Sequence, residues 1–408
     1  MTLAESAFRV ILVWVMIVYL ATLEGGQVAV VSLAAVPRAS YEDTHKVTAK
    51  CLAVVDKAGA MEKYIMGRQF LVVIVIFVLN IVSTGSTTCE SMAFGPMTDV
   101  AAAVCSTGLS LTFVTILVAQ ITSQIVASCC RLDFINNYLM WVNTRLALAI
   151  EYSGILHTVH LVRILLARLF SAPDDPGVGA VNIFSLVTNS ARFFWVRVLL
   201  SLFLLWFSIV AIFHEVMLGH TDSMGSAPGF VNLIIVFVFM MVIGLYEGLQ
   251  IALCALAHVD VGVLREKSPA AAANCQLTFG THLESFLIGR QMFVTVFVFF
   301  VAGTTTISES WKNNSDYTTF GIGSEYLQAI LTSGLPASLI TTILGSLIFR
   351  IAAAKNPVAY LSNPVVGPAI RICLVVESTG IMQFAWVLSK LFMCVLRFRL
   401  DSSILSTS

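Results

Sequence analysis

The chain has 408 residues, of which 58% are hydrophobic and 11% are charged, and its formal net charge is zero. Its mean hydropathy is +0.90, which a soluble protein of this length could carry only with large exposed apolar patches. The composition therefore excludes a soluble globular domain and indicates a polytopic α-helical membrane protein. No basic or acidic tail suggests a nucleic-acid partner, and we expect none.

Apolar segments recur along the whole chain, and most are long enough to cross about 30 Å of hydrocarbon. The first is too long and too poor in basic flanks for a cleaved signal peptide, so we expect it to remain as a span. The segment at 138–170 is either one span or a split one. The nine predicted spans are about 8–36, 65–86, 98–129, 138–170, 193–217, 229–257, 286–306, 327–353 and 364–398.

A stretch rich in Pro, Asp and Gly at 171–177 interrupts the chain near its middle and predicts a linker. We expect a first transmembrane repeat over 1–170, the linker over 171–192 and a second transmembrane repeat over 193–398. A short cytoplasmic tail would follow over 399–408, because the basic loop at 37–64 places the C-terminus on the cytoplasmic side.

Two short polar words occur once in each half of this apolar chain. The first copy is Glu24-Gly25-Gly26-Gln27 followed by Gly67-Arg68-Gln69, and the second is Glu247-Gly248-Leu249-Gln250 followed by Gly289-Arg290-Gln291. A shift of 222 aligns the surroundings of the two GRQ words, so that Gly67 matches Gly289. A shift of 226 aligns the later segments, including Glu151 to Ile155 with Glu377 to Ile381, so the sequence contains an internal repeat.

The number of spans between the two copies predicts their relative direction. From the segment holding Glu24 to the segment holding Glu247 there are five crossings, and an odd number reverses the direction. We therefore expect two inverted-topology repeats of about five helices each, an architecture typical of secondary transporters with a binding site near the bilayer midplane. The second repeat has a span at 193–217 ahead of its glutamate, whereas the first has none, so the first span of a five-plus-five arrangement is expected to be absent here.

The repeated words place costly polar groups inside apolar segments. Glycine at these positions predicts discontinuous helices whose freed carbonyls, next to a carboxylate, suit Na+ or a proton. A glutamine supplies two donors and one acceptor, which suits a neutral hydroxylated solute, and the arginines can neutralise the glutamates. The predicted helix-break glycines are Gly25, Gly26, Gly67, Gly248 and Gly289. The predicted substrate-binding residues are Glu24, Gln27, Arg68, Gln69, Glu247, Gln250, Arg290 and Gln291, with Na+ near Glu24 and Glu247.

Other interpretations of the polar residues stay open. Each Glu–Arg pair alone would also serve as a structural clamp between helices. Glu151 and Glu377 are secondary polar candidates, although a glutamate bonded to a neighbouring helix explains them equally well. His157, His214 and His258 have no counterparts in the other half, so no metal site or proton relay is expected. No phosphate loop, HExxH word or nucleophile elbow is present in the sequence, so we expect neither an enzyme nor a cofactor.

The paired EGxQ and GRQ words resemble those of the silicic acid transporters of diatoms and other silicifying protists, and through the repeat the resemblance covers essentially the whole chain. It implies sodium-coupled uptake of silicic acid across the plasma membrane by alternating access, with silicic acid, Na+ and membrane lipid as partners. Members of that family typically have ten spans, against the nine counted here. The alternatives are a channel or symporter for another small neutral hydroxylated solute such as boric acid, or a transport-inactive silicic acid sensor. A homo-oligomer is compatible with the sequence.

Overall fold

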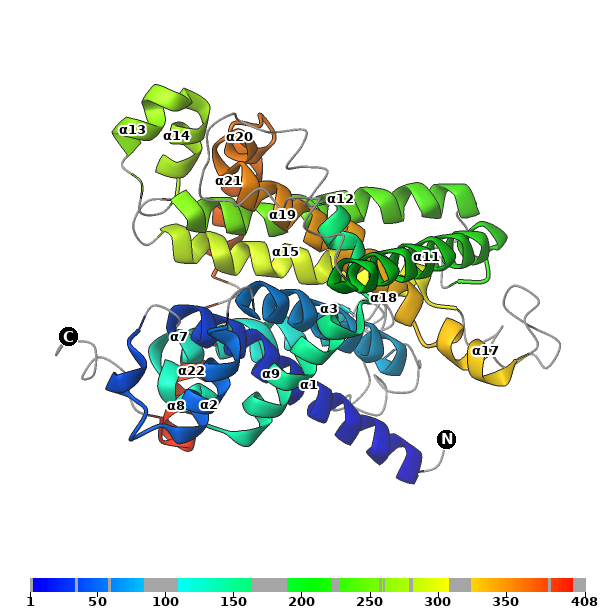
Figure 1. Ribbon diagram of the computed structural model, residues 1–408, viewed down its shortest axis with the longest axis horizontal. Coiled ribbons are helices and arrows are strands. Elements are labelled where there is room, and N and C mark those ends of the chain that lie inside the picture. The colour runs from blue at the N-terminus through cyan, green and yellow to red at the C-terminus, as the bar shows by residue number, and fades with distance from the viewer. Residues whose placement is uncertain are drawn as a thin grey trace. The chain divides into compact units, whose positions relative to one another are not determined.

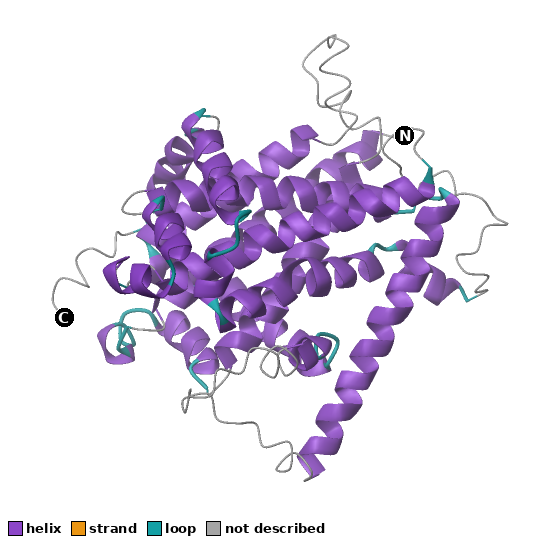
Figure 2. Cartoon of the chain, turned by 90° about the horizontal axis from the view of Figure 1, so that it is seen from above, coloured by secondary structure: helices purple, strands orange, loops and turns teal. Residues whose placement is uncertain are grey.

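The structure is a computed structural model, and it describes most of the chain as helix. The described residues are 3–33, 36–57, 60–83, 109–162, 189–221, 228–256, 259, 261–278, 282–307, 324–380 and 383–398. Within them the only strand-like pairing is one isolated antiparallel bridge between Thr221 and Ile307, and Figure 2 accordingly shows helices and loops. The all-α prediction is confirmed for this part of the chain, whereas the tail at 399–408 and most of the linker at 171–192 lie outside it.

The helices are labelled in Figure 1 and differ widely in length. Their bounds are α1 (Leu3–Leu33), η1 (Arg38–Ser40), α2 (Lys46–Val55), α3 (Ala60–Ser83), α6 (Leu109–Val114), η2 (Thr115–Thr122), α7 (Ser123–Cys129), α8 (Arg131–Ile135), α9 (Tyr138–Ser153), α11 (Asn189–Leu218), α12 (Gly229–Leu256), α13 (Val261–Lys267), α14 (Pro269–Gln276), α15 (His282–Thr305), α17 (Glu325–Thr332), α18 (Leu335–Thr342), η5 (Ile343–Leu347), α19 (Ile348–Lys355), α20 (Pro357–Leu361), α21 (Val366–Ser378) and α22 (Phe384–Leu396).

Seven helical stretches among the described residues are long and apolar enough to cross a membrane, which makes this a multi-pass membrane protein. Each overlaps one of the nine predicted spans. They are Val10–Leu33, Ala60–Val82, Leu111–Cys129, Phe193–Leu218, Gly229–Leu256, Ser285–Thr305 and Leu335–Lys355.

The other two predicted spans, 138–170 and 364–398, are broken. Helix α9 ends at Ser153 and α21 ends at Ser378, and a glycine with positive φ follows in each case, Gly154 at 91° and Gly380 at 76°. Helix resumes at residue 158 in the first segment and at Phe384 in the second. The prediction of one continuous span at 364–398 is therefore wrong, and the split alternative holds for the described part of 138–170. The left-handed conformation that ends both helices is one that glycine adopts without strain.

Alanine at either glycine should destabilise the protein, to a different degree. The left-handed conformation costs a non-glycine residue about 1–2 kcal/mol, and at Gly154 an added Cβ would also meet Arg197 Cγ at 2.9 Å. At Gly380 the nearest atom would be 3.6 Å away. We therefore expect Gly154→Ala to lower the unfolding temperature of the purified protein more than Gly380→Ala does, and equal shifts would contradict the packing argument.

Helix bounds recur at the two shifts found in the sequence. At the shift of 222, α3 (60–83) coincides with α15 (282–305) at both ends. At the shift of 226, α8 (131–135) coincides with α20 (357–361), and the composite helix from α6 to α7 (109–129) coincides with the one from α18 to α19 (335–355). Each composite helix contains a π-helical stretch at an overlapping aligned position, η2 in the first and η5 in the second. The local structure therefore repeats together with the sequence.

The chain forms two compact units, and neither is a continuous stretch of sequence. Unit 1 comprises Met1–Ala149, Ile288–Thr306 and Val375–Ser408, and unit 2 comprises Ile150–Leu287 and Ile307–Leu374. The predicted repeats lie on either side of 171–192 and are defined by sequence similarity between the two halves. The grouping of the helices into these units does not test that division.

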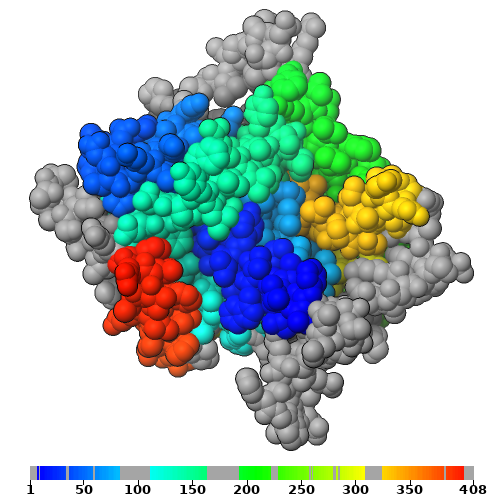
Figure 3. All heavy atoms as spheres, turned by 90° about the horizontal axis from the view of Figure 1, so that it is seen from below, coloured from blue at the N-terminus to red at the C-terminus, as the bar shows by residue number. Residues whose placement is uncertain are grey.

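Helix α1 is the central element of unit 1. It packs on α3, η2, α7 and α8, while α22 packs on η2 and α7, and the labels of α7, α8 and α22 lie together in Figure 1. In the space-filling view the C-terminal helix α22, coloured red, lies against turquoise residues of the same unit (Figure 3). One apolar cluster joins these elements: Ile116, Ile121, Ile125 and Ala385, with Leu117, Ile288, Met292 and Val296 packed against them.

Helix α12 has the corresponding place in unit 2. It packs on α19, η5, α20 and α11, and α14 packs on α13 and α20. The partners of α1 and α12 thus include aligned elements, η2 with η5, α7 with α19 and α8 with α20, so each glutamate word meets a similar local environment.

Candidate functional site

In unit 1, the carboxylate of Glu24 lies between two polar partners from other helices. Glu24 is 5% exposed, its Oε2 is 3.4 Å from Nη1 of Arg68, and the same oxygen accepts a hydrogen bond of 3.0 Å from Nε2 of Gln124. Arg68, which is 1% exposed, supplies the compensating charge that a buried carboxylate requires.

Arg68 also holds the side chain of Gln69, the next residue of the first GRQ word. Its Nη2 donates to Oε1 of Gln69 at 2.8 Å, and its Nη1 donates to the carbonyl oxygen of Leu23 at 3.3 Å. Arg290 makes the matching contact, with Nη2 donating to Oε1 of Gln291 at 2.5 Å. In both GRQ words the arginine therefore orients the glutamine beside it.

The predicted helix breaks at the glycines of these words are wrong. Helices α1, α3, α12 and α15 run without interruption through Gly25, Gly26, Gly67, Gly248 and Gly289. Where contacts are described, the glycines permit close packing instead. An added Cβ on Gly25 would meet Ser123 O at 2.8 Å, and one on Gly67 would overlap the Ala147 carbonyl, whose carbon would be 2.7 Å away. The reason is that glycine lacks a side chain as well as tolerating unusual φ, and at these positions its small size is what the packing requires.

In unit 2, Glu247 is held by an arginine that lies outside the repeated words. Glu247 is 3% exposed, and its Oε2 accepts a hydrogen bond of 2.7 Å from Nε of Arg350 and a second from Nη2 of Arg350. Such charge-assisted pairs are the strong class of hydrogen bond. Arg350 is thus a charge partner of Glu247 that the repeated words alone do not identify.

The hydroxyl end of the Tyr360 ring packs onto Gly248, the glycine of the second EGxQ word. An added Cβ on Gly248 would meet Tyr360 Cζ at 2.5 Å, and the hydroxyl donates to the carbonyl oxygens of Gly244 and Leu245 at 3.3 and 3.1 Å. Burial, reinforced by the negative charge of Glu247, raises the pKa of Tyr360, so the phenol stays protonated and remains a donor.

Residues at aligned positions make corresponding contacts in the two units. The shift of 226 places Gln124 on Arg350 and Phe134 on Tyr360, and in each unit the first residue contacts the glutamate while the second covers the glycine that follows it. Sequence reasoning missed all four. For Gln124 and Arg350 the available signal was a polar residue at the same aligned position of two apolar runs.

Two glutamines of the words have unused hydrogen-bonding capacity. Gln27 and Gln250 are half-buried, and neither side chain forms a hydrogen bond with another residue in the described part of the chain. Each lies about one turn from its glutamate, so the amides are free to bind a polar ligand.

The π-helical stretches contain buried polar atoms with no partner among the described residues. The Oε1 of Gln120 accepts a hydrogen bond from Thr295, but its Nε2 has none, although Gln120 is 1% exposed. The hydroxyl of the aligned Ser346 in η5 is also buried without a hydrogen-bond partner among the described residues. π-Helical turns are frequent at functional sites, and unsatisfied buried donors indicate a missing partner.

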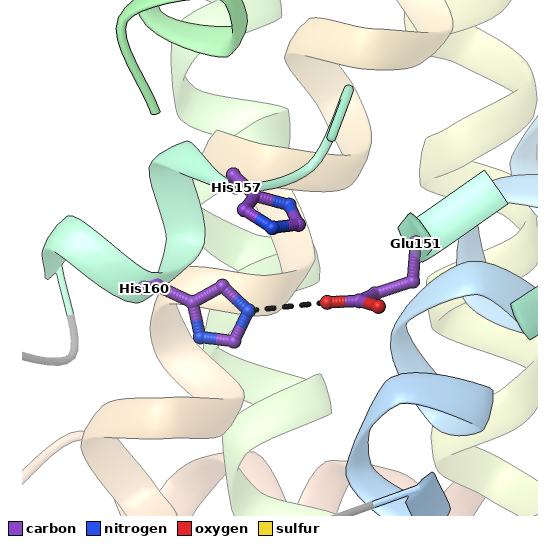
Figure 4. A group of neighbouring side chains, drawn as sticks. All are labelled: Glu151, His157 and His160. Atoms are coloured by element: carbon purple, nitrogen blue, oxygen red, sulfur yellow. Dashed lines mark hydrogen bonds and ion pairs between the residues drawn. The ribbon is translucent and has the colours of Figure 1, made fainter. Parts of the chain in front are cut away.

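The secondary candidates Glu151 and Glu377 differ from each other. Glu151 is buried, and its Oε1 lies 3.3 Å from Nε2 of His160, with His157 beside them (Figure 4). Glu377 is half-buried and has no ion pair with another described residue. The sequence did not single out His160.

Comparison with known proteins gives one finding that spans the chain. A family model described as "Silicon transporter" matches residues 2–408. No curated protein and no solved structure matches.

Proposed function

Because the chain belongs to the silicon transporter family, whose members move silicic acid across membranes, we propose that it takes up silicic acid together with Na+ by alternating access. We propose that the Glu, Gln and Arg residues of the repeated words bind the substrate, in an architecture of two inverted repeats like that of secondary transporters. The recurrence of helix bounds at the shifts of 222 and 226 supports the repeat.

The assignment of silicic acid as the substrate rests on the free side-chain amides of Gln27 and Gln250. Orthosilicic acid is small, neutral and tetrahydroxylated, so its binding requires neutral donors and acceptors rather than surplus charge. The glutamates beside these amides are already compensated by Arg68 and Arg350. The unsatisfied donors on Gln120 and Ser346 are further candidates for holding the hydroxyl groups.

A coupled cation has a clear use for a neutral solute. Silicic acid gains nothing from the membrane potential, whereas one positive charge moving inward supplies about 2.3 kcal/mol per 100 mV. The carboxylates of Glu24 and Glu247 are oxygen ligands of the type that Na+ takes, and uptake from the medium would place the protein in the plasma membrane.

Removing either free amide should weaken substrate binding without unfolding the protein. For Gln27→Ala and Gln250→Ala we expect the KM for silicic acid to rise about tenfold, since each loses hydrogen bonds worth about 1–1.5 kcal/mol. The exposed Gln276 provides the matched control, and Gln276→Ala should transport like the parent protein. The measurement is uptake into proteoliposomes, with germanic acid as competitor. Unchanged KM in both site variants would remove these glutamines from the binding site.

Sodium coupling should appear as a gradient-dependent rate. We expect uptake into proteoliposomes to be several-fold faster with Na+ outside than with choline, and an inside-negative potential to increase it further. Equal rates in choline, with no other ion gradient imposed, would contradict symport and favour the channel alternative.

A further inference from the structure

The side chains of Glu151, His157 and His160 form a cluster in unit 2 that the proposed transport mechanism does not use. Their ligand atoms all lie within 4.8 Å of one another, with 3.3 Å between Glu151 Oε1 and His160 Nε2, and the two imidazole rings have centroids 5.2 Å apart. Figure 4 shows the two rings and the carboxylate facing one another from either side of the helix break.

The backbone around the cluster is anchored to α11. The hydroxyl of Thr158 donates to Oγ of Ser201 at 2.7 Å, and Ser201 donates to the carbonyl oxygen of Ile155 at 2.5 Å. The ring of Phe194, also on α11, lies 5.9 Å from His157 and 6.1 Å from His160. The two imidazoles are therefore packed against α11, while 19% of the His160 side chain is exposed.

The aligned break in the other half is a natural comparison, because two of its backbone hydrogen bonds match while the aligned residues are not histidines. The amide of His157 donates to Gly154 O at 3.0 Å and that of His160 to His157 O at 3.0 Å. At the shift of 226, Gln383 donates to Gly380 O and Trp386 donates to Gln383 O, both at 3.0 Å. These two backbone hydrogen bonds thus form with Gln and Trp as well as with two histidines, so they do not explain the two imidazoles.

We propose that Glu151, His157 and His160 form a binding site for a divalent transition-metal cation of the Zn2+ type. Two neutral imidazoles and one carboxylate are a ligand set that Zn2+ takes when a fourth position stays open. In a tetrahedral site with bonds of about 2.0–2.1 Å, neighbouring ligand atoms are about 3.3 Å apart, which matches the contact between Glu151 and His160. The carboxylate also supplies the negative charge that stabilises a divalent cation in a largely buried site.

The test is Zn2+ binding to the full-length protein, purified with a tag free of histidine and stripped of metal. We expect one Zn2+ per chain by calorimetry, a higher unfolding temperature with Zn2+ than with Mg2+, and visible absorption bands when Co2+ replaces Zn2+. His157→Gln, which copies Gln383, should weaken Zn2+ binding about tenfold or more, as should His160→Gln at the more exposed position. His45→Gln is the matched control, because His45 pairs with Asp133 at 3.1 Å outside the cluster.

Two results would overturn the site: a parent protein that binds Zn2+ no more tightly than His160→Gln, or a His45→Gln variant that loses binding to the same extent. If His157→Gln does not fold, the comparison of parent, His160→Gln and His45→Gln still decides. Since the readout is binding and spectroscopy, a failure of the silicic acid assignment would leave the result unaffected.

Discussion

Replacing Arg350 with methionine should cause one of the largest losses of stability of any single substitution in unit 2. Methionine keeps much of the volume but removes both hydrogen bonds to Oε2 of Glu247. Breaking a buried ion pair from one side costs about 3–5 kcal/mol, so we expect a sharp fall in unfolding temperature and no uptake of silicic acid. The measurement is thermal unfolding of the purified protein followed by transport in proteoliposomes.

The aligned position in unit 1 provides the control for this substitution. Gln124→Met removes one hydrogen bond to Glu24, which keeps its ion pair with Arg68, and should cost only about 1.5–3 kcal/mol. The double variant Glu247→Gln with Arg350→Met should recover part of the stability, because no buried carboxylate then loses its partner. Equal unfolding temperatures for Arg350→Met and Gln124→Met would show that the Arg350 pair contributes no more than a single hydrogen bond.

Alanine at Gly67 should be even less tolerated, although it adds a single methyl group. The new Cβ would overlap the backbone carbonyl of Ala147, so α3 and α9 would have to separate, and interiors packed to crystal density resist such shifts. We expect little folded protein after purification, as judged by size-exclusion chromatography, and no uptake from the remainder.

Gly303 tests whether this effect comes from packing. It also lies in a helix of unit 1, but the nearest atom to an added Cβ would be Asn80 Nδ2 at 3.8 Å. Alanine favours a helix by up to about 1 kcal/mol over glycine, so Gly303→Ala should be as stable as the parent protein or more so. A Gly67→Ala protein that folded equally well would contradict the close approach of α3 and α9.

The class of protein and the polar residues of the repeated words could be predicted because both depend on composition and on the cost of burying charge. Glu24, Arg68, Gln69 and Glu247 are buried inside apolar helices. The partners Gln124 and Arg350 could not be predicted in the same way, since they reach the glutamates from helices far away along the chain. Their contacts depend on how helices pack in space.

The helix breaks show where sequence reasoning met a real ambiguity. Glycine serves both where φ must be positive and where two backbones approach closely, and the pattern alone does not separate these uses. In the EGxQ and GRQ words the close approach applies, while the positive φ occurs at Gly154 and Gly380, each three residues after a glutamate. The cluster at Glu151 was missed for a related reason: His160 comes within reach of the carboxylate only because the chain turns at Gly154.

The division of the chain between the two units has a consequence for biosynthesis. Unit 1 contains α1, near the start of the sequence, yet it also contains Ile288–Thr306 and Val375–Ser408. Because chains emerge and fold from the N-terminus, α1 and its neighbours must wait in the bilayer for α22 before their unit is complete. A nascent chain arrested before Val375 would therefore hold an unfinished unit 1, and quality-control proteases would be expected to recognise it as a late assembly intermediate.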